Sequence, residues 1–207
     1  MERISTRTLH VLALVLAAAL ALSPALWADK RPYTFDRAHS QVNFVAEALL
    51  LTAHGFYEKW DADVQIDADN IENSSVSFTI DAASINTRNE RRDNHLRSAD
   101  FFDVANHSNI TFVSKSVRRV DDRNIVITGD LTIRGVTKEI QAPTHVVFLR
   151  EGRGRFKGEF QINRKEFGVS YDSRGNPIED TVKVQFDLNV VDQEMMRQRQ
   201  QGKKSSD

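Results

Sequence analysis

Apolar and polar residues alternate strictly along most of the chain after residue 30. The clearest stretch is TVKVQFDLNV at 181–190, where apolar residues occupy every second position. The same period of two recurs in WDADVQID (60–67), SVSFTID (75–81), NIVITGDLTIRG (124–135) and RFKGEFQIN (155–163). Because successive side chains of a strand point to opposite faces, this pattern predicts antiparallel strands with one buried face and one face in water.

Shorter segments add strands, and turn sequences separate them. SQVNFVAE (40–47) and NITFVS (109–114) are typical of strands, and Gly135 between two alternating stretches predicts a tight hairpin. Strands recur roughly every dozen residues, which favours an antiparallel barrel or sandwich over alternating strands and helices.

The alternation stops at TRNERRDNHLRSADFF, residues 87–102. Thr87 followed by Glu90 fits a capping box, so we expect a short helical insertion near 88–102 between strands. Its charged residues are spaced to form ion pairs along the helix; they are Arg91, Arg92, Asp93, Arg97 and Asp100. Phe101 and Phe102 would then point into one end of the β structure. The sequence leaves two roles open for this insertion: a lid over a portal, or a structural plug.

The two ends of the chain lack strand alternation. Arg3 and Arg7 precede the apolar run VLALVLAAALAL (11–22), which is too short to span a bilayer, and small residues follow it. These features predict a secretory signal peptide over 1–28. The remaining segment 29–191 has the usual size of one domain, and 192–207 is predicted to be a polar, mobile C-terminal tail.

Composition narrows the chemistry. The chain contains no cysteine, which excludes disulfides, thiolate catalysis and Cys-ligated iron–sulfur clusters. The net charge is −1 with mixed signs along the chain, so no basic field indicates a nucleic-acid partner. The histidines are scattered singly, and no pair on one element has metal-ligand spacing, so we expect no metal site.

Four motifs resemble the YceI-like family of exported proteins: AHSQVNF (38–44), ASINTRNERRDNHLRSADFFDVANHSNITF (83–112), ITGDLTIRGVTKEI (127–140) and NRKEFGV (163–169). The resemblance covers 33–191. It implies an all-β fold, an extended, lipocalin-like antiparallel β-barrel of about eight strands around an elongated apolar cavity. It also implies that the cavity holds a long polyisoprenoid chain, such as an isoprenoid quinone tail. Ser108 stands where the family usually has proline, and the family motifs offer no catalytic residue to carry over.

Strand phase and the helical insertion select the side chains expected to line this cavity. The expected wall consists of Val42, Phe44, Phe56, Val64, Phe78, Ile80, Phe101, Phe102, Phe112, Leu131, Ile133, Phe160, Ile162, Phe186 and Leu188. Small residues at inward positions would leave room inside; they are Ala62, Gly129 and Gly158. Alternation alone does not separate a cavity wall from a packed core.

We therefore expect a periplasmic binding or carrier protein that sequesters a long-chain isoprenoid or another amphiphilic lipid. It would need no cofactor, although an isoprenoid lipid or quinone would be its ligand. The alternative is a lipid-modifying enzyme that uses His39, His54 and His145 inside the barrel. A third hypothesis is a β-module that binds a protein partner; it would need an exposed apolar patch, and the clean alternation gives no sign of one. The sequence is compatible with a homodimer and with transient membrane contact, and it leaves both open.

Overall fold

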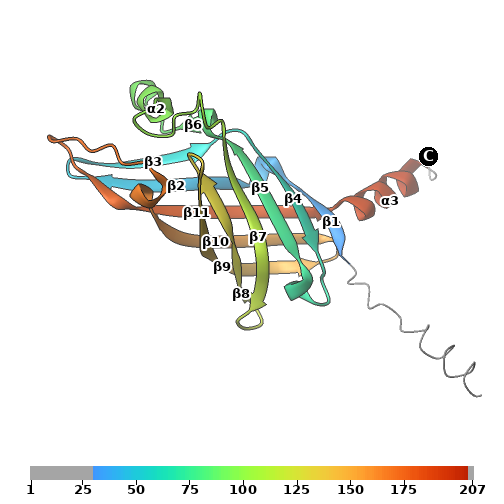
Figure 1. Cartoon of the computed structure of the whole chain (residues 1–207). Helices are drawn as coiled ribbons and strands as arrows, with labels where there is room; N and C mark the ends of the chain where they lie inside the picture. The colour runs from blue at the N-terminus through green and yellow to red at the C-terminus, as the bar shows by residue number, and fades with distance from the viewer. Residues whose placement is uncertain (1–29, 205–207) are drawn as a thin grey trace, which may run out of the picture.

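A computed structural model describes residues 30–204 of the chain (Figure 1). The predicted signal peptide at 1–28 lies outside the described residues. The strands are β1 (Arg31–Phe35), β2 (Gln41–Ala48), β3 (Leu51–Tyr57), β4 (Trp60–Ile66), β5 (Ser75–Asp81), β6 (Ile85–Asn86), β7 (Asn109–Arg119), β8 (Asn124–Ile133), β9 (Val136–Arg150), β10 (Arg153–Asn163) and β11 (Ile178–Asp192). The helices are α2 (Glu90–Arg97), α3 (Gln193–Lys204) and the short 3-10 turns η1 (Arg37–His39), η2 (Ile71–Asn73), η3 (Ala82–Ser84) and η4 (Arg164–Phe167).

The sheet closes on itself. Strands β1, β4, β5, β7, β8, β9, β10 and β11 follow one another in space, all antiparallel. The last residues of β11 pair back to β1, with Tyr33 opposite Asp192 and Phe35 opposite Val190. This pairing gives a closed barrel of eight strands (Figure 1). The barrel prediction is therefore confirmed, and the sandwich alternative is wrong.

One wall of the barrel extends beyond the closed ring. β2 pairs with the first part of β11, and β1 pairs with its last part, so η1 interrupts what is otherwise one long strand beside β11. β2 continues into a hairpin with β3, and β6 adds a short pairing to the end of β3. This hairpin projects with the segment that precedes β11 at the end of the molecule opposite α3 (Figure 1).

The predicted tight hairpin at Gly135 is present between β8 and β9. Arg134 and Gly135 both have positive φ, at 50° and 74°, and Ile133 pairs with Val136. A two-residue loop with two left-handed residues matches the right-handed twist of the flanking strands, which explains why glycine stands here.

Helix α2 confirms the predicted insertion, but its cap is not the predicted one. The Asn89 side chain accepts a hydrogen bond from the Arg92 amide at 3.0 Å, so Asn89 caps the helix in place of Thr87. Thr87 is buried, and its amide donates to the Asp93 carboxylate at 2.9 Å. Asp93 is buried as well, and this bond satisfies it inside the protein.

Two arginines of α2 donate to backbone carbonyl oxygens of the chain that precedes the helix, whereas the sequence predicted ion pairs along the helix surface. Arg97 donates to the carbonyl oxygens of Ala83 at 2.7 Å and Ile85 at 2.8 Å. Arg92 donates to the Thr87 carbonyl oxygen at 2.9 Å. Guanidinium groups present several donors in a fixed geometry, so each can hold two chain segments together.

The C-terminal segment is helical. The sequence predicted a polar, mobile tail over 192–207; the structure has helix α3 from Gln193 to Lys204, and the mobility of this segment stays a prediction. Asp192 is buried, and its carboxylate accepts hydrogen bonds from the amides of Glu194 and Met195, so it caps this helix. The strand prediction missed this cap because Asp192 also belongs to β11. None of the helices within residues 30–204 is long and apolar enough to cross a membrane.

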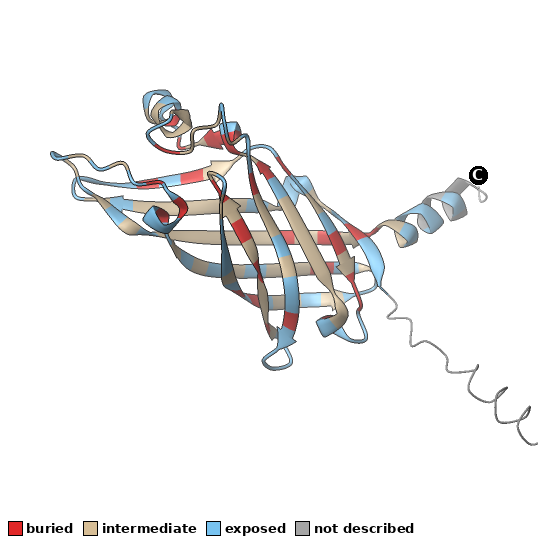
Figure 2. Cartoon of the chain, viewed as in Figure 1, coloured by how far each residue is buried: buried red, intermediate tan, exposed pale blue. Residues whose placement is uncertain are grey.

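Burial alternates along much of β4 and β8 and at the end of β11, whereas most of β2 and the middle of β11 are half-buried throughout (Figure 2). In β8, Ile125, Leu131 and Ile133 are buried, and in β11 Leu188 and Val190 are buried. The outward faces carry charged side chains that pair across strands. Arg155 of β10 donates two hydrogen bonds to Asp187 of β11, at 2.9 Å and 2.8 Å, and this pairing lowers the pKa of the Asp187 carboxyl.

Replacing Asp187 with asparagine tests the contribution of this pair to stability. A carboxyl whose pKa is lowered by folding stabilises the protein above its unfolded pKa of about 3.9, and the stabilisation is lost as pH falls through the folded pKa. We expect Asp187→Asn to lower the free energy of unfolding by about 1 kcal/mol at neutral pH, with less effect in acid. Urea unfolding from pH 7 down into the acid range measures this; an equal loss at every pH would contradict it.

Candidate ligand cavity

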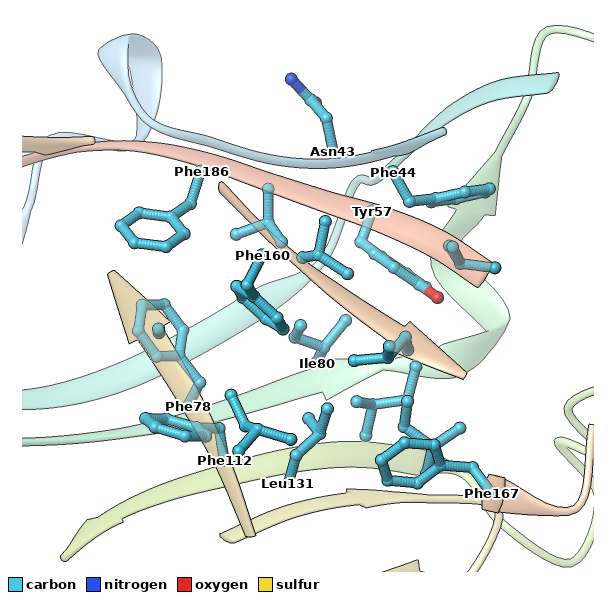
Figure 3. Close-up of a pocket in the computed structure, with 18 of the residues that line it drawn as sticks. Asn43, Phe44, Tyr57, Phe78, Ile80, Phe112, Leu131, Phe160, Phe167 and Phe186 are labelled. Carbon is cyan, nitrogen blue, oxygen red and sulfur yellow. The ribbon is translucent and has the colours of Figure 1, made fainter. Parts of the chain in front are cut away.

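A cavity of about 480 Å³ occupies the inside of the barrel and is lined mainly by apolar side chains (Figure 3). This volume falls in the range typical of small-molecule sites. All the predicted wall residues except Phe56 line it: Val42, Phe44, Val64, Phe78, Ile80, Phe101, Phe102, Phe112, Leu131, Ile133, Phe160, Ile162, Phe186 and Leu188. Their contact with a ligand stays a prediction.

Phe56 is the exception, and its placement on the wall was wrong. It stands opposite Asn43 in the β2–β3 pair, and the Asn43 side chain points away from the other labelled residues in Figure 3. The inward positions of β3 carry Ala53 and Gly55, the latter opposite Phe44. Ala53 and Gly55 face the cavity and Phe56 faces out. The large phenylalanine side chain therefore does not mark the inward face of this strand.

Phenylalanine rings lie flat against the wall where glycines leave room for them. A Cβ atom built on Gly55 would lie 2.2 Å from Cζ of Phe44, and one on Gly158 would lie 2.1 Å from Cζ of Phe186. The pairs of this kind are Phe44 with Gly55, Phe112 with Gly129, and Phe186 with Gly158. We expected Gly129 and Gly158 to leave open space; the rings occupy it, and they project less into the lumen as a result.

Tyr57 places one hydroxyl among these apolar side chains (Figure 3). Burial raises the pKa of Tyr57 well above its usual value, so the group stays neutral at physiological pH. A neutral hydroxyl can donate one hydrogen bond to a polar ligand group without adding a charge to the cavity. The alternation missed Tyr57 because Gly55 and Phe56 interrupt the apolar pattern of β3.

Aromatic side chains close the cavity beneath helix α2. The His95 ring packs edge to face against the rings of Phe101 and Tyr171, with distances between ring centroids of 4.9 Å and 4.8 Å. All three residues line the cavity. Phe101 is buried in the main apolar cluster, and its carbonyl oxygen accepts a hydrogen bond from Arg134 at 2.7 Å. This packing favours the plug over the lid for Phe101, whereas Phe102 is only half-buried.

Arg164 fixes the chain that completes this end of the wall. It is buried, and it donates hydrogen bonds to the carbonyl oxygens of Val169 and Tyr171 at 2.8 Å, Ile178 at 3.0 Å and Glu179 at 2.9 Å. One guanidinium thus holds in place the irregular segment between η4 and β11, most of which pairs with no strand. Strand periodicity could not reveal this role, because the segment between η4 and β11 has no period.

The three histidines of the enzyme hypothesis do not meet inside the barrel. His39, His54 and His145 are all exposed. His39 bonds to the Asp36 carboxylate at 2.8 Å, and His145 bonds to the Asn124 side chain at 3.0 Å. These histidines therefore do not form the site inside the barrel that the enzyme hypothesis requires. Within residues 30–204, no three or more His, Asp or Glu side chains gather closely enough to hold a metal ion.

Sequence comparison agrees with the geometry. The profile of the YceI-like domain matches residues 33–190. A UPF0312 protein of Ectopseudomonas mendocina is 35% identical over 191 residues, which cover 87% of this chain and 96% of that protein. A UPF0312 protein of Staphylococcus aureus (strain USA300) is 41% identical over 148 residues, which cover 67% of this chain and 82% of that protein.

Solved structures share the barrel. Burkholderia cenocepacia BcnA matches with a TM-score of 0.70 at 26% identity, over 75% of this chain and 98% of that one. The Campylobacter jejuni YceI protein matches with a TM-score of 0.61 at 27% identity, over 65% and 82%. A polyisoprenoid binding domain from Saccharophagus degradans matches with a TM-score of 0.61 over 79% and 99%, and its 20% identity shows a shared fold alone.

Replacing Gly55 with alanine tests whether the flat rings keep the cavity open. The new methyl group must displace the Phe44 ring, because the atoms nearest to it all belong to that ring. We expect several-fold weaker binding of an apolar fluorescent dye, with a loss of unfolding free energy of about 1 kcal/mol. Gly175→Ala is the matched control, since nothing lies within 4 Å of its Cβ position. Equal dye affinity in both variants would show that Phe44 does not set the cavity size.

Proposed function

The chain belongs to the YceI-like family, and from this premise we propose that it binds and carries a long-chain isoprenoid lipid in its barrel cavity. The observation that carries the proposal is the apolar cavity of about 480 Å³ enclosed by the predicted wall residues. Each methylene group that leaves water for such a cavity stabilises binding by roughly 0.8 kcal/mol, so a long tail supplies the affinity.

The chemistry of the wall favours a ligand whose buried part is a hydrocarbon. Aromatic and aliphatic side chains from almost every strand face the cavity, and polar groups are few. A charged head group would lose its hydration there without enough compensating partners, so it would stay near an end of the barrel. The fold shared with a polyisoprenoid binding domain of Saccharophagus degradans supports an isoprenoid as the tail.

We place this activity in the periplasm. The predicted signal peptide at 1–28 supports export, and the absence of cysteine suits a domain whose stability does not depend on disulfides. A carrier in an aqueous compartment would shield the tail from water during transfer. The closed hydrogen bonding of the barrel supports this role, because it encloses the tail without leaving an open sheet edge around the ring.

The direct test is mass spectrometry of an organic extract of the protein purified without detergent from its host. A prenyl compound present at close to one molecule per chain would support the proposal. Protein that carries no lipid, and that does not take up a prenylated benzoquinone added in solution, would overturn it. Straight-chain lipids at the same occupancy would assign the cavity to acyl chains and reject the isoprenoid.

Filling the cavity should remove binding without unfolding the barrel. Phe186 lies against Gly158 on the cavity wall, so Phe186→Trp adds volume to the lumen. We expect at least tenfold weaker binding of a prenylated benzoquinone and a loss of unfolding free energy below the 1–3 kcal/mol typical of overpacked cores. Phe56→Trp makes the same change on the outer face and should leave affinity unchanged. A large stability loss for Phe186→Trp with unchanged affinity would indicate a packed core.

A further inference from the structure

The tip of the β2–β3 hairpin consists of leucines that face solvent. Leu49 is 71% exposed, Leu50 is 74% exposed, and Leu51, the first residue of β3, is 43% exposed. The other large apolar residues with high exposure stand singly at distant places in the chain; in residues 30–204 they are Val113, Val120, Phe148 and Met196. Isolated exposed apolar side chains are ordinary on protein surfaces, whereas three consecutive leucines form a patch.

Turn chemistry does not account for these leucines. Ala48 pairs with Leu51, so Leu49 and Leu50 form a two-residue hairpin loop. Such loops favour glycine, asparagine and aspartate. Neither leucine has the positive φ that those residues adopt in this kind of loop. Leu49 and Leu50 neither fill the core nor suit the turn. Their exposure therefore indicates a surface that is covered by an apolar partner when the protein functions.

The two backbone amides of the hairpin loop already have hydrogen-bond acceptors within the protein. The Leu49 amide donates to the Pro177 carbonyl oxygen at 3.0 Å, and the Leu50 amide donates to the Asn176 side-chain oxygen at 2.9 Å. These two donors would otherwise lose their hydrogen bonds to water on entering an apolar phase, at considerable cost. Because the segment before β11 supplies both acceptors, the leucine turn can enter an apolar phase without leaving these two amides unpaired.

The cavity wall continues to this tip. Ala48, Leu51 and Ile178 line the cavity, and Ile178 stands opposite Ala48 in the β2–β11 pair. The hairpin and the segment before β11 project together, at the end of the molecule opposite α3 (Figure 1). An apolar surface that joins the inside of the cavity to the outside provides a continuous route for a hydrocarbon tail.

Charges around the tip favour a neutral surface over an anionic one. Segments 45–54 and 171–179 together carry three acidic side chains and one basic side chain; these are Glu47, Asp172 and Glu179 with Arg174. Attraction to anionic lipid needs a cluster of lysine and arginine, which these segments lack. A leucine tip without basic neighbours fits insertion driven by apolar area.

We propose that the leucine tip, Leu49–Leu51, inserts into the surface of a bilayer of zwitterionic lipids and so brings the cavity to the membrane from which its ligand comes. This inference rests on the proposed function, because it gives the membrane as the source and destination of the cargo. It assigns a role to the exposed leucines of the hairpin, which lie at the end of the cavity and not along it.

Flotation of the lipid-free protein with phosphatidylcholine vesicles tests the proposal. We expect Leu49→Ser/Leu50→Ser to lower the partition coefficient at least tenfold, since burying one leucine is worth about that factor. Val120→Ser is the matched control, because Val120 is also exposed, at 53%, and lies away from the hairpin. Binding of the parent protein should persist at about 0.5 M salt, where surface charge is screened, and should not rise when phosphatidylglycerol is added.

The outcomes separate this proposal from the proposed function. Vesicle binding that is absent in the parent, or equal in the double variant, overturns the tip as a membrane anchor, whereas binding of a prenylated benzoquinone in solution reports on the cavity independently. Binding that depends on phosphatidylglycerol and disappears in salt would also overturn it. A parent dimer that the double variant converts to a monomer, with vesicle binding unchanged, would assign the leucines to contact between two copies.

Discussion

The pairing of β1 with the end of β11 closes the sheet, and the apolar interior depends on this closure. Only three residue pairs make it, from Tyr33 opposite Asp192 to Phe35 opposite Val190. Asp192 lies at this junction with its carboxylate buried, where it caps α3 and its amide donates to the Gly152 carbonyl oxygen at 2.7 Å. Burial and the neighbouring Asp192 raise the pKa of Tyr33, so the Tyr33 hydroxyl is neutral at neutral pH.

An eight-stranded ring encloses a space that side chains can fill completely, so an open lumen requires a specific arrangement of the wall. Phe44, Phe112 and Phe186 provide it by lying over Gly55, Gly129 and Gly158. The rings contribute apolar area while they occupy the space that a side chain at each glycine would fill. The wall thus offers a long tail many apolar contacts and few polar groups, which makes tail length and shape the properties that it can select.

The region beneath helix α2 and the β2–β3 hairpin border the cavity in different ways. Beneath α2, buried polar groups hold the chain: the Thr87 amide donates to the Asp93 carboxylate, and Arg164 donates to the carbonyl oxygens of Val169 and Tyr171. At the β2–β3 hairpin, exposed leucines continue the cavity wall outward. Fixed hydrogen bonds suit a permanent closure, whereas an apolar tip suits an opening that meets lipid.

The sequence by itself determined most of the strands, most of the inward-facing residues and the helical insertion, because these follow from a local period of two and its interruption at 87–102. It did not predict β1, β3 or β6. It could not determine which ends of the sheet meet, since the pairing of Tyr33 with Asp192 joins residues at opposite ends of the domain. Phe56 was assigned to the wrong face because strand phase was read from side-chain size, and Gly55 holds the inward position. Thr87 was predicted as the helix cap, but its amide donates to the buried Asp93 carboxylate, and Asn89 caps α2 in its place. Only the tertiary structure decided that the leucines at 49–51 face solvent, because exposure depends on what the rest of the chain leaves uncovered.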